Sequence, residues 1–297
     1  MDSGQRVPRP AVVLELLKPI TWFAPMWAFA CGVVSSGQPV DVTLLLVGLV
    51  LTGPLVCAAS QAVNDWYDRH VDAINEPDRP IPSGRLPGRW GLYVAFAWTG
   101  LSLVVATLLG TWGFIATVIG LILAWIYSMP PIRLKKDGWW GNAAVGACYE
   151  GLPWFTGAAV MLGTLPDHRI ILLAVLYSVG AHGIMTLNDF KSIEGDRALG
   201  LRSIPARLGA RPAAILACVV MAVSQAVVIV LLFAWSMPIV ASIVTALLVA
   251  QLALMRTLIK TPKERAAWYN ATGTTLYVAG MMVSAVGLNL STPAAGA

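Results

Sequence analysis

Asn64-Asp65-Trp66-Tyr67-Asp68-Arg69-His70-Val71-Asp72 closes a long apolar run, at a point where an otherwise hydrophobic chain places three carboxylates. At about 100° per residue on an α-helix, positions 64, 65, 68 and 72 fall within about 100° of one another. One helix face therefore carries an amide and three carboxylates, a costly arrangement beside lipid unless a ligand or a counter-charge meets them. We interpret this stretch as part of a functional site.

A second copy of the pattern begins 124 residues later (188 minus 64), as Asn188-Asp189-Phe190-Lys191-Ser192-Ile193-Glu194-Gly195-Asp196. On a continuous helix Asn188, Asp189, Ser192 and Asp196 share one face, and Glu194 points away. Two acidic helix ends that face each other would form a site for divalent cations.

The composition predicts an all-α integral membrane protein. Of the 297 residues, 57% are hydrophobic and 12% are charged, and the mean hydropathy is +0.72. A soluble protein of this length needs more polar surface, and the sequence lacks the alternating ten-residue pattern of a membrane β-barrel. We expect residues 1–297 to form one domain, a single bundle of about nine transmembrane helices at 19–36, 42–64, 91–110, 112–128, 142–163, 169–188, 212–235, 238–259 and 267–290.

The basic residues predict the orientation of this bundle. With residues 1–17 as a cytoplasmic N-terminal tail, 19 of the 20 Lys and Arg residues fall on the cytoplasmic side, and Arg169 lies outside. This asymmetry follows the positive-inside rule and puts both acidic motifs at cytoplasmic helix ends, those of helices 2 and 6. It also explains the sequence pI of about 9.2 without a nucleic acid partner. Since no leader precedes the first span, we expect a multi-pass protein of a bacterial inner membrane.

The two motifs occupy equivalent places in the predicted topology. Each ends a span that runs from outside to inside, and each is followed by a basic loop with Pro and Gly. We interpret spans 2–4 and spans 6–8 as an internal repeat. The simplest alternative, in which the acids only pair with neighbouring basic residues, would have to hold for both copies.

Carboxylates and cations on one membrane face suit a polyanion that is bound through a metal ion. Mg²⁺ prefers one or two protein carboxylates together with phosphate oxygens and water. Lys and Arg side chains neutralise the remaining phosphate charge. The candidate cations in the loops near the motifs are Arg79, Lys135, Lys191 and Arg202.

The motifs and the loops that follow them resemble the UbiA-type intramembrane prenyltransferase superfamily over roughly residues 15–290. The resemblance lies in Asn-Asp-x-x-Asp-x-x-x-Asp, then Arg-Pro-Ile-Pro-Ser-Gly at 79–84, Tyr-Ser-x-Pro-Pro at 127–131, and the second acidic motif. Stretches 64–93, 127–157 and 180–209 resemble the (bacterio)chlorophyll synthases more closely. Arg-Leu-Pro-Gly-Arg-Trp-Gly-Leu-Tyr at 85–93 favours the bacteriochlorophyll branch.

The resemblance implies esterification of the propionate of bacteriochlorophyllide a with a C20 prenyl group, geranylgeranyl or phytyl. The donor would be the prenyl diphosphate, pyrophosphate would be released, and the location would include intracytoplasmic photosynthetic membrane. The Mg²⁺ ligands would come from Asn64, Asp65, Asp68, Asp72, Asn188, Asp189 and Asp196. Arg79, Lys135 and Arg202 would stabilise the leaving pyrophosphate, and Tyr127 would donate a hydrogen bond to it. Ser192 stands where many superfamily members have an Asp.

Three residues inside apolar spans are candidates for binding the pigment. An ionisable group there indicates function by default, and a protonated Glu150 would donate a hydrogen bond to a macrocycle carbonyl. His182, two turns before the second motif, would coordinate the pigment magnesium, and Trp154 would line the macrocycle. The alternatives are structural: a Glu satisfied by a neighbouring helix, and a hydrogen bond between helices for the histidine.

Other functions stay open at this point. Chlorophyllide, a quinone precursor or a haem are alternative acceptors, because the acidic motifs handle only the diphosphate. A transporter of an anionic solute also places charge among broken helices, but its site belongs near the bilayer midplane. A pigment-binding assembly factor without catalysis is a third alternative, and other pigment-biosynthesis or assembly proteins are open as partners.

Overall fold

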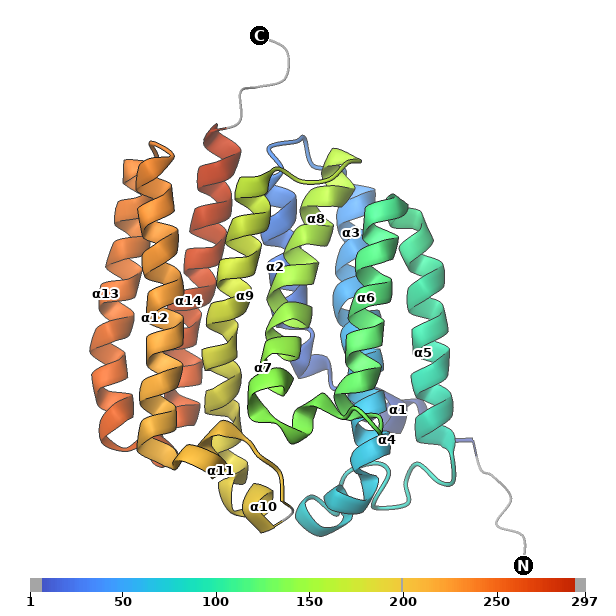
Figure 1. Cartoon of the computed structure of the whole chain (residues 1–297). Coiled ribbons are helices and arrows are strands. Elements are labelled where there is room, and N and C mark those ends of the chain that lie inside the picture. Colours follow the sequence, from blue (N-terminus) through green and yellow to red (C-terminus); the bar gives the residue numbers. More distant parts are fainter. Residues whose placement is uncertain (1–6, 199, 292–297) are drawn as a thin grey trace, which may run out of the picture.

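Apolar sequence with helical spacing produces helices throughout the computed structural model, which describes residues 7–198 and 200–291 (Figure 1). The first half contains α1 (Pro10–Leu17), η1 (Pro19–Thr21), α2 (Phe23–Ser35), α3 (Val42–Val50), η2 (Leu51–Cys57), α4 (Ala58–Asn75), α5 (Trp90–Ala106), η3 (Thr107–Leu109) and α6 (Gly110–Ser128). The second half contains η4 (Leu134–Lys136), α7 (Gly138–Gly146), η5 (Ala147–Gly151), α8 (Leu152–Leu162), α9 (His168–Asn188), η6 (Asp189–Ser192), α10 (Ile193–Ala198), α11 (Ile204–Leu208), α12 (Ala210–Ala234), α13 (Pro238–Lys260) and α14 (Pro262–Ser291). The prediction of an all-α fold is confirmed.

Six helical segments of the described chain are long and apolar enough to cross a membrane, or up to seven if the bent pair of Pro10–Thr21 and Phe23–Ser35 is one span. One of the six, Trp90–Ser128, contains both α5 and α6, which run antiparallel beside each other in Figure 1. The chain is therefore a multi-span membrane protein, and the count of nine spans stays a prediction. The predicted tail 1–17 contains a helix, α1, whose Leu16 and Leu17 are buried.

Two wide π-helical turns interrupt long helices close to the first acidic motif and to the cavity described below. Pro54 lies inside η2, where its missing N–H prevents regular α-helical hydrogen bonding. The Trp98 Nε1 donates a hydrogen bond to the Pro54 carbonyl at 3.1 Å, so the irregular turn is satisfied within the bundle. The second π-turn, η5, leads into α8, which carries Pro153 in its first turn.

The centre of the bundle is packed by aromatic side chains from three helices. Trp154 stacks on Tyr177 with 5.5 Å between ring centroids, and Tyr277 meets Tyr177 edge-on at 5.3 Å. The Tyr277 hydroxyl donates to the Tyr177 carbonyl at 2.6 Å. All three side chains are fully buried. This packing joins α8, α9 and α14, and α9 is the helix that leads into the second acidic motif.

A buried glutamine pair joins α12 to α13. Gln225 and Gln251 each donate an Nε2 hydrogen bond to the other's Oε1, at 3.0 and 2.8 Å, and both are 0% exposed. Interhelical hydrogen bonds of this kind contribute about 1 kcal/mol in membranes.

Gln251→Leu should therefore lower the thermal unfolding temperature in detergent, since it leaves the Gln225 amide without its partner. The destabilisation should be on the order of 1–2 kcal/mol. Gln225→Leu combined with Gln251→Leu should recover part of the loss, because no amide is then stranded. Equal stability of the single variant and wild type would contradict a stabilising role for the pair.

Candidate active site

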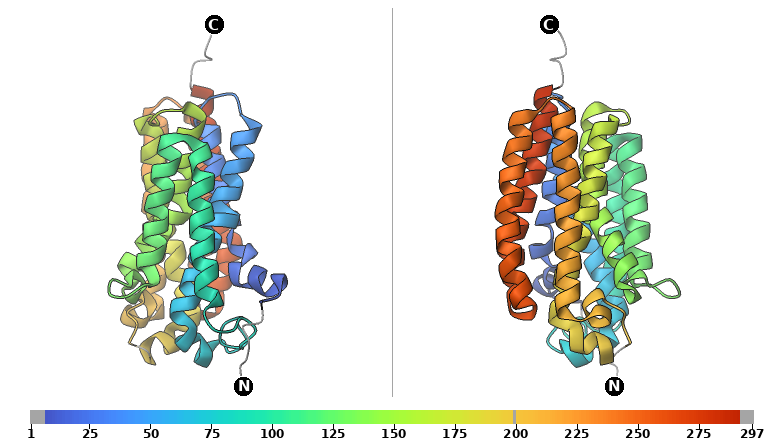
Figure 2. Two further views of the ribbon diagram at one scale, coloured as in Figure 1. Left: turned by 90° about the vertical axis from the view of Figure 1, so that its right-hand side faces the viewer. Right: turned by 60° about the vertical axis from the view of Figure 1, so that its left-hand side comes forward.

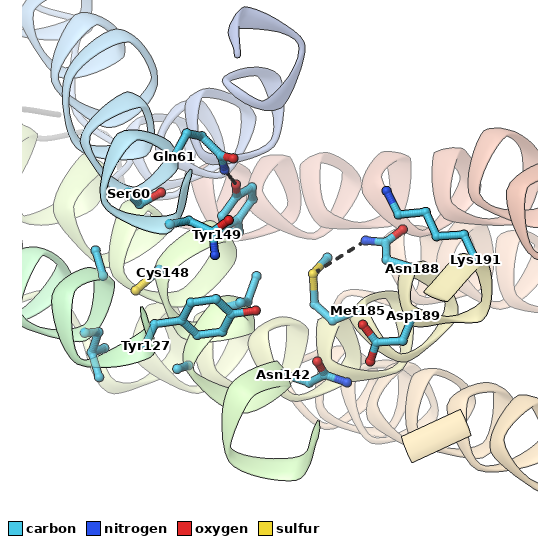
Figure 3. A pocket seen from close by; sticks show the side chains of 15 residues that line it. Ser60, Gln61, Tyr127, Asn142, Cys148, Tyr149, Met185, Asn188, Asp189 and Lys191 are labelled. Carbon is cyan, nitrogen blue, oxygen red and sulfur yellow. Dashed lines mark hydrogen bonds between the residues drawn. The ribbon is translucent and has the colours of Figure 1, made fainter. Parts of the chain in front are cut away.

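The two acidic motifs lie at the same end of the bundle, the lower end in Figure 1, which we call the motif end. A cavity of about 320 Å³ opens between them. Its walls come from α4, α6, α7, η5, α9 and η6, so helices far apart in sequence meet around it (Figure 3). Residues of both motifs line this cavity: Asn64 of the first motif on one side, and Asn188 and Asp189 of the second on the other.

Polar side chains line this cavity on two opposite sides. On one side the Gln61 Nε2 donates to the Tyr149 hydroxyl at 3.0 Å (Figure 3). Across from this pair lie Asp189 and Lys191, with Tyr127 extending between the two sides. Leu123, Ala124, Val145 and Met185 complete the apolar part of the wall.

A smaller cavity of about 130 Å³ continues toward the loops of the motif end. It shares Tyr127, Asn142 and Asp189 with the larger one and adds Lys135 and Asp196. Asp189 therefore lies at the junction of a larger chamber and a small charged pocket. A substrate with a long organic part and a compact anionic end matches this shape.

The carboxylates of the first motif are held by cations. Asp65 contacts the Lys18 ammonium at 2.7 Å and an Arg79 nitrogen at 3.4 Å. The same arginine reaches Asp72 at 2.8 Å. The alternative interpretation, that acids pair with neighbouring basic residues, thus describes this motif in the structure.

Asp68 forms ion pairs with a different set of cations, which belong to the loop after α6. Arg133 contacts one carboxylate oxygen at 3.0 Å and Lys135 contacts the other. Lys135 also donates to the Ser128 hydroxyl at 3.2 Å, which in turn accepts from the Asn64 amide at 3.2 Å. Burial lowers the pKa of the Lys135 ammonium below its ordinary value, and the Asp68 carboxylate opposes this shift.

The second motif is met by neutral donors. Asp196 accepts from the Ser192 hydroxyl at 3.0 Å and from the Ser203 hydroxyl at 2.5 Å. Asn142, a neutral side chain whose amide donates to the Thr186 hydroxyl at 3.2 Å, lines both cavities together with Asp189. Because these partners leave the negative charge uncompensated, the second motif is the more available one for a cation. Ser192, which stands where many superfamily members have an Asp, thus donates to Asp196 in this structure.

The backbone of the second motif differs from the continuous helix that was expected. The helix α9 ends at Asn188, a tighter 3-10 turn (η6) follows, and α10 begins at Ile193. The tighter turn still leaves Ser192 and Asp196 in contact. Glu194 points away from the site, as predicted, and contacts Lys263 at 2.6 Å.

The donor set fits Mg²⁺ only together with a substrate phosphate. Within residues 7–198 and 200–291, no three His, Cys, Asp or Glu side chains converge closely enough to hold a metal by themselves. Mg²⁺ does not require such a cluster, since one or two carboxylates suffice when phosphate oxygens and water complete the octahedron. Two buried atoms of the site, Asp65 Oδ2 and Arg133 Nε, have no hydrogen-bond partner, so the site retains unused acceptor and donor capacity.

Two predicted diphosphate ligands lie elsewhere. Arg79 is engaged by Asp65, Asp72 and Glu76, so its guanidinium organises the first motif and does not line either cavity. The backbone N–H of Arg202 donates to the Lys136 carbonyl, in the loop after α6, at 2.9 Å. The Arg202 side chain is exposed. The diphosphate role of Arg202 is therefore not supported, because the chain uses it to tie two loops together. Lys135 and Lys191 do line the cavities.

The three pigment candidates do not line the cavities either. Trp154 is packed in the core and donates to the Ser35 hydroxyl at 3.0 Å, so these contacts do not support the predicted contact with a macrocycle. His182 is buried, and its Nε2 lies 3.1 Å from the Trp139 carbonyl, which matches the alternative of a contact between helices. Glu150 is buried in η5, whereas its neighbours Cys148 and Tyr149 face the cavity.

Several site residues escaped prediction. Asn142 lies at the junction of both cavities, and Arg133 and Lys18 pair with the first motif. Gln61 and Tyr149 form the polar pair of the larger cavity. The spacing of Gln61 and Asn64, three residues apart, puts them on one helix face and is a signal for Gln61; the other pairings depend on tertiary structure.

Comparisons with known proteins agree with this geometry. The UbiA prenyltransferase family model matches residues 23–288. The chain is 61% identical to the bacteriochlorophyll synthase 33 kDa chain of Cereibacter sphaeroides, over 94% of this chain and 93% of that protein. It is 55% identical to the protein of the same name from Rhodobacter capsulatus, over 95% of each.

Among solved structures, a UbiA homolog from Archaeoglobus fulgidus bound to GPP and Mg²⁺ has the same fold. Its TM-score is 0.69 at 21% sequence identity, over 90% of this chain and 99% of that one. Fold, family model and sequence identity lead to one conclusion: the chain is a member of the UbiA prenyltransferase family.

Proposed function

We propose that this protein is a bacteriochlorophyll synthase that transfers a C20 prenyl group, geranylgeranyl or phytyl, to the propionate of bacteriochlorophyllide a. The observation that carries the choice of acceptor is the 61% identity to a bacteriochlorophyll synthase chain over 94% of the sequence. The shape of the site supports the donor, since a larger chamber leads into a small pocket with Lys135, Asp189 and Asp196.

The charged pocket is where we place the diphosphate. Asp189 and Asp196 line this pocket and would hold Mg²⁺ together with the diphosphate oxygens. Asn64, Asp68, Asp72 and Asn188 are the further ligands that the family resemblance implies. Bound Mg²⁺ would neutralise the diphosphate and favour departure of pyrophosphate. Lys135 adds positive charge in the charged pocket and Lys191 adds it in the larger cavity, and the Tyr127 hydroxyl is available as a hydrogen-bond donor at the junction.

The transfer itself exchanges one C–O bond for another. The bond between prenyl C1 and the diphosphate oxygen breaks, and a propionate oxygen of the pigment forms the new bond to C1. The propionate is already ionised near neutral pH, so this site needs no strong general base. The chamber contributes a wall that excludes water from the allylic cation, through Leu123, Ala124, Val145 and Met185.

The function is tested by incubating purified protein with geranylgeranyl diphosphate, Mg²⁺ and one acceptor at a time. Bacteriochlorophyllide a should yield prenyl ester and pyrophosphate in equal amounts, and chlorophyllide and a quinone precursor should react more slowly. Prenylation of the quinone precursor with no pigment ester would overturn the choice of acceptor while keeping the prenyltransferase chemistry.

We also propose that the motif end faces the cytoplasm of a bacterial inner membrane, with the N-terminus on the same side. The basic loops at this end support the orientation through the positive-inside rule. Asn64 of α4 and Asn188 of α9 both line the cavity, and this similar placement of the two motifs supports the internal repeat of spans 2–4 and 6–8.

Labelling of single cysteines should test this orientation. Glu76→Cys is suitable because the side chain is 51% exposed at the motif end, whereas Gly200 has a φ of +68° that a cysteine would strain. In intact cells an impermeant maleimide should label His168→Cys, at the opposite end and 77% exposed, and should not label Glu76→Cys. The reverse pattern would overturn the proposed topology.

A further inference from the structure

A second, apolar groove lies at the motif end, between α1 and the start of α5. It measures about 750 Å³, and all twelve residues that line it are apolar or aromatic. One wall contains Val7 and Leu14, and the other contains Trp90, Tyr93 and Trp98. The groove is separate from the acidic cavities, with which it shares no lining residue.

The helix α1 lies at the edge of the bundle and is tilted against its long helices, as Figure 2 shows, and the chain bends by 54° where it passes into α2. The inner face of α1 is packed, with Leu16 and Leu17 at 0% and 4% exposure, while Leu14 on the helix and Val7 just before it are 50% and 77% exposed. Ile20, just beyond the helix, is 92% exposed. A short helix with this pattern is typical of the boundary between headgroups and acyl chains.

Charge at the edges of the groove selects the kind of lipid. Arg9 lies between two residues of one wall, and Arg89 directly precedes the other wall at Trp90. Both arginines are exposed, and neither has an ion-pair partner among the residues that the structure describes. The one acid of α1, Glu15, is neutralised by two contacts from Arg85 at 2.5 and 2.7 Å.

We propose that this groove binds an anionic phospholipid of the leaflet at the motif end, with an acyl chain between α1 and α5 and the headgroup phosphate at Arg9 and Arg89. Apolar walls fit the chain, and two uncompensated cations fit the phosphate. The bound lipid holds α1 in place, and Lys18 at the end of that helix contacts Asp65 of the first acidic motif. Lipid composition is thereby linked to the geometry of the acidic site.

The test is photolabelling of the full-length protein in phosphatidylcholine nanodiscs that contain a trace of a lipid with a diazirine in its acyl chain. The photoreactive lipid is phosphatidylglycerol in one sample and phosphatidylcholine in the other. Phosphatidylglycerol should label peptides covering 7–17 and 90–98 more strongly, by roughly fivefold for each arginine. Arg9→Gln with Arg89→Gln should remove this preference. Arg211→Gln, which removes an exposed cation at the start of α12, should keep it.

A second variant and a second measurement distinguish binding of the anionic lipid in the groove from non-specific contact with bilayer lipids. Ala97→Phe places a ring in the groove and should reduce labelling by both lipids. Added phosphatidylglycerol should slow amide hydrogen exchange in residues 10–17 of wild type and not of the double arginine variant. Equal labelling by the two lipids would overturn the proposal. The proposal would also be overturned if the groove peptides were labelled no more strongly than the peptide containing the exposed Val230. Cross-links from the groove to another protein chain would overturn it as well.

Discussion

Asp189→Asn should lower the rate of prenyl transfer by about a hundredfold or more while the protein remains folded in detergent. The carboxylate lies at the junction of the two cavities and is met there by the neutral side chain of Asn142. The substitution keeps the size of the side chain and removes its charge, so a metal–diphosphate complex loses its most available ligand. The rate should be measured with saturating substrates and with Mg²⁺ in excess.

Glu194→Gln is the matched control, since it also removes a carboxylate from the second motif. This side chain is 73% exposed and contacts Lys263, away from the cavities. Its variant should retain nearly full activity. If Asp189→Asn and Glu194→Gln had equal rates, the role assigned to the junction would be contradicted.

Lys135→Gln should have the next largest effect, again about a hundredfold on turnover. Lys135 lines the charged pocket, while the adjacent Lys136 is exposed and does not. Lys136→Gln should therefore behave like wild type. Lys135→Arg keeps the charge at any pH and should restore part of the rate. Because the pKa of Lys135 is lowered by burial, wild-type activity should also decline at a less alkaline pH than that of this arginine variant.

Lys135 also contacts Asp68, so its loss could act by leaving that carboxylate unpaired. The double variant Asp68→Asn with Lys135→Gln separates the two explanations. If the lysine only neutralised Asp68, the double variant would have the same rate as Asp68→Asn alone. We expect the double variant to be slower than Asp68→Asn alone, because the diphosphate then also lacks the cation.

The sequence predicted the helical membrane fold and the two facing motifs because both depend on local pattern. Long apolar runs require helices in a bilayer, and a spacing of three or four residues puts Asn64 and Asp68 on one face. That residues of both motifs line one cavity is a finding of the structure.

The pairings inside the site could not be read from the sequence, because they depend on how loops fold back. Lys18, 47 residues from Asp65, reaches it through the helix α1. Arg202 was grouped with the diphosphate ligands by its neighbours along the chain, yet its backbone pairs with another loop. The sequence around Trp154 does not distinguish a ring packed in the core from a ring that binds a ligand. Only the tertiary structure shows that this ring is buried.

A structure of the protein with Mn²⁺ and a non-reactive thiolodiphosphate analogue of geranylgeranyl diphosphate would locate the donor. We predict the diphosphate in the charged pocket, within contact distance of Lys135 and the Tyr127 hydroxyl, and metal density between it and Asp189. The prenyl chain should extend into the larger cavity toward Gln61 and Tyr149. A diphosphate bound outside the two cavities, with Asp189 and Asp196 contacting neither metal nor ligand, would contradict the proposed site.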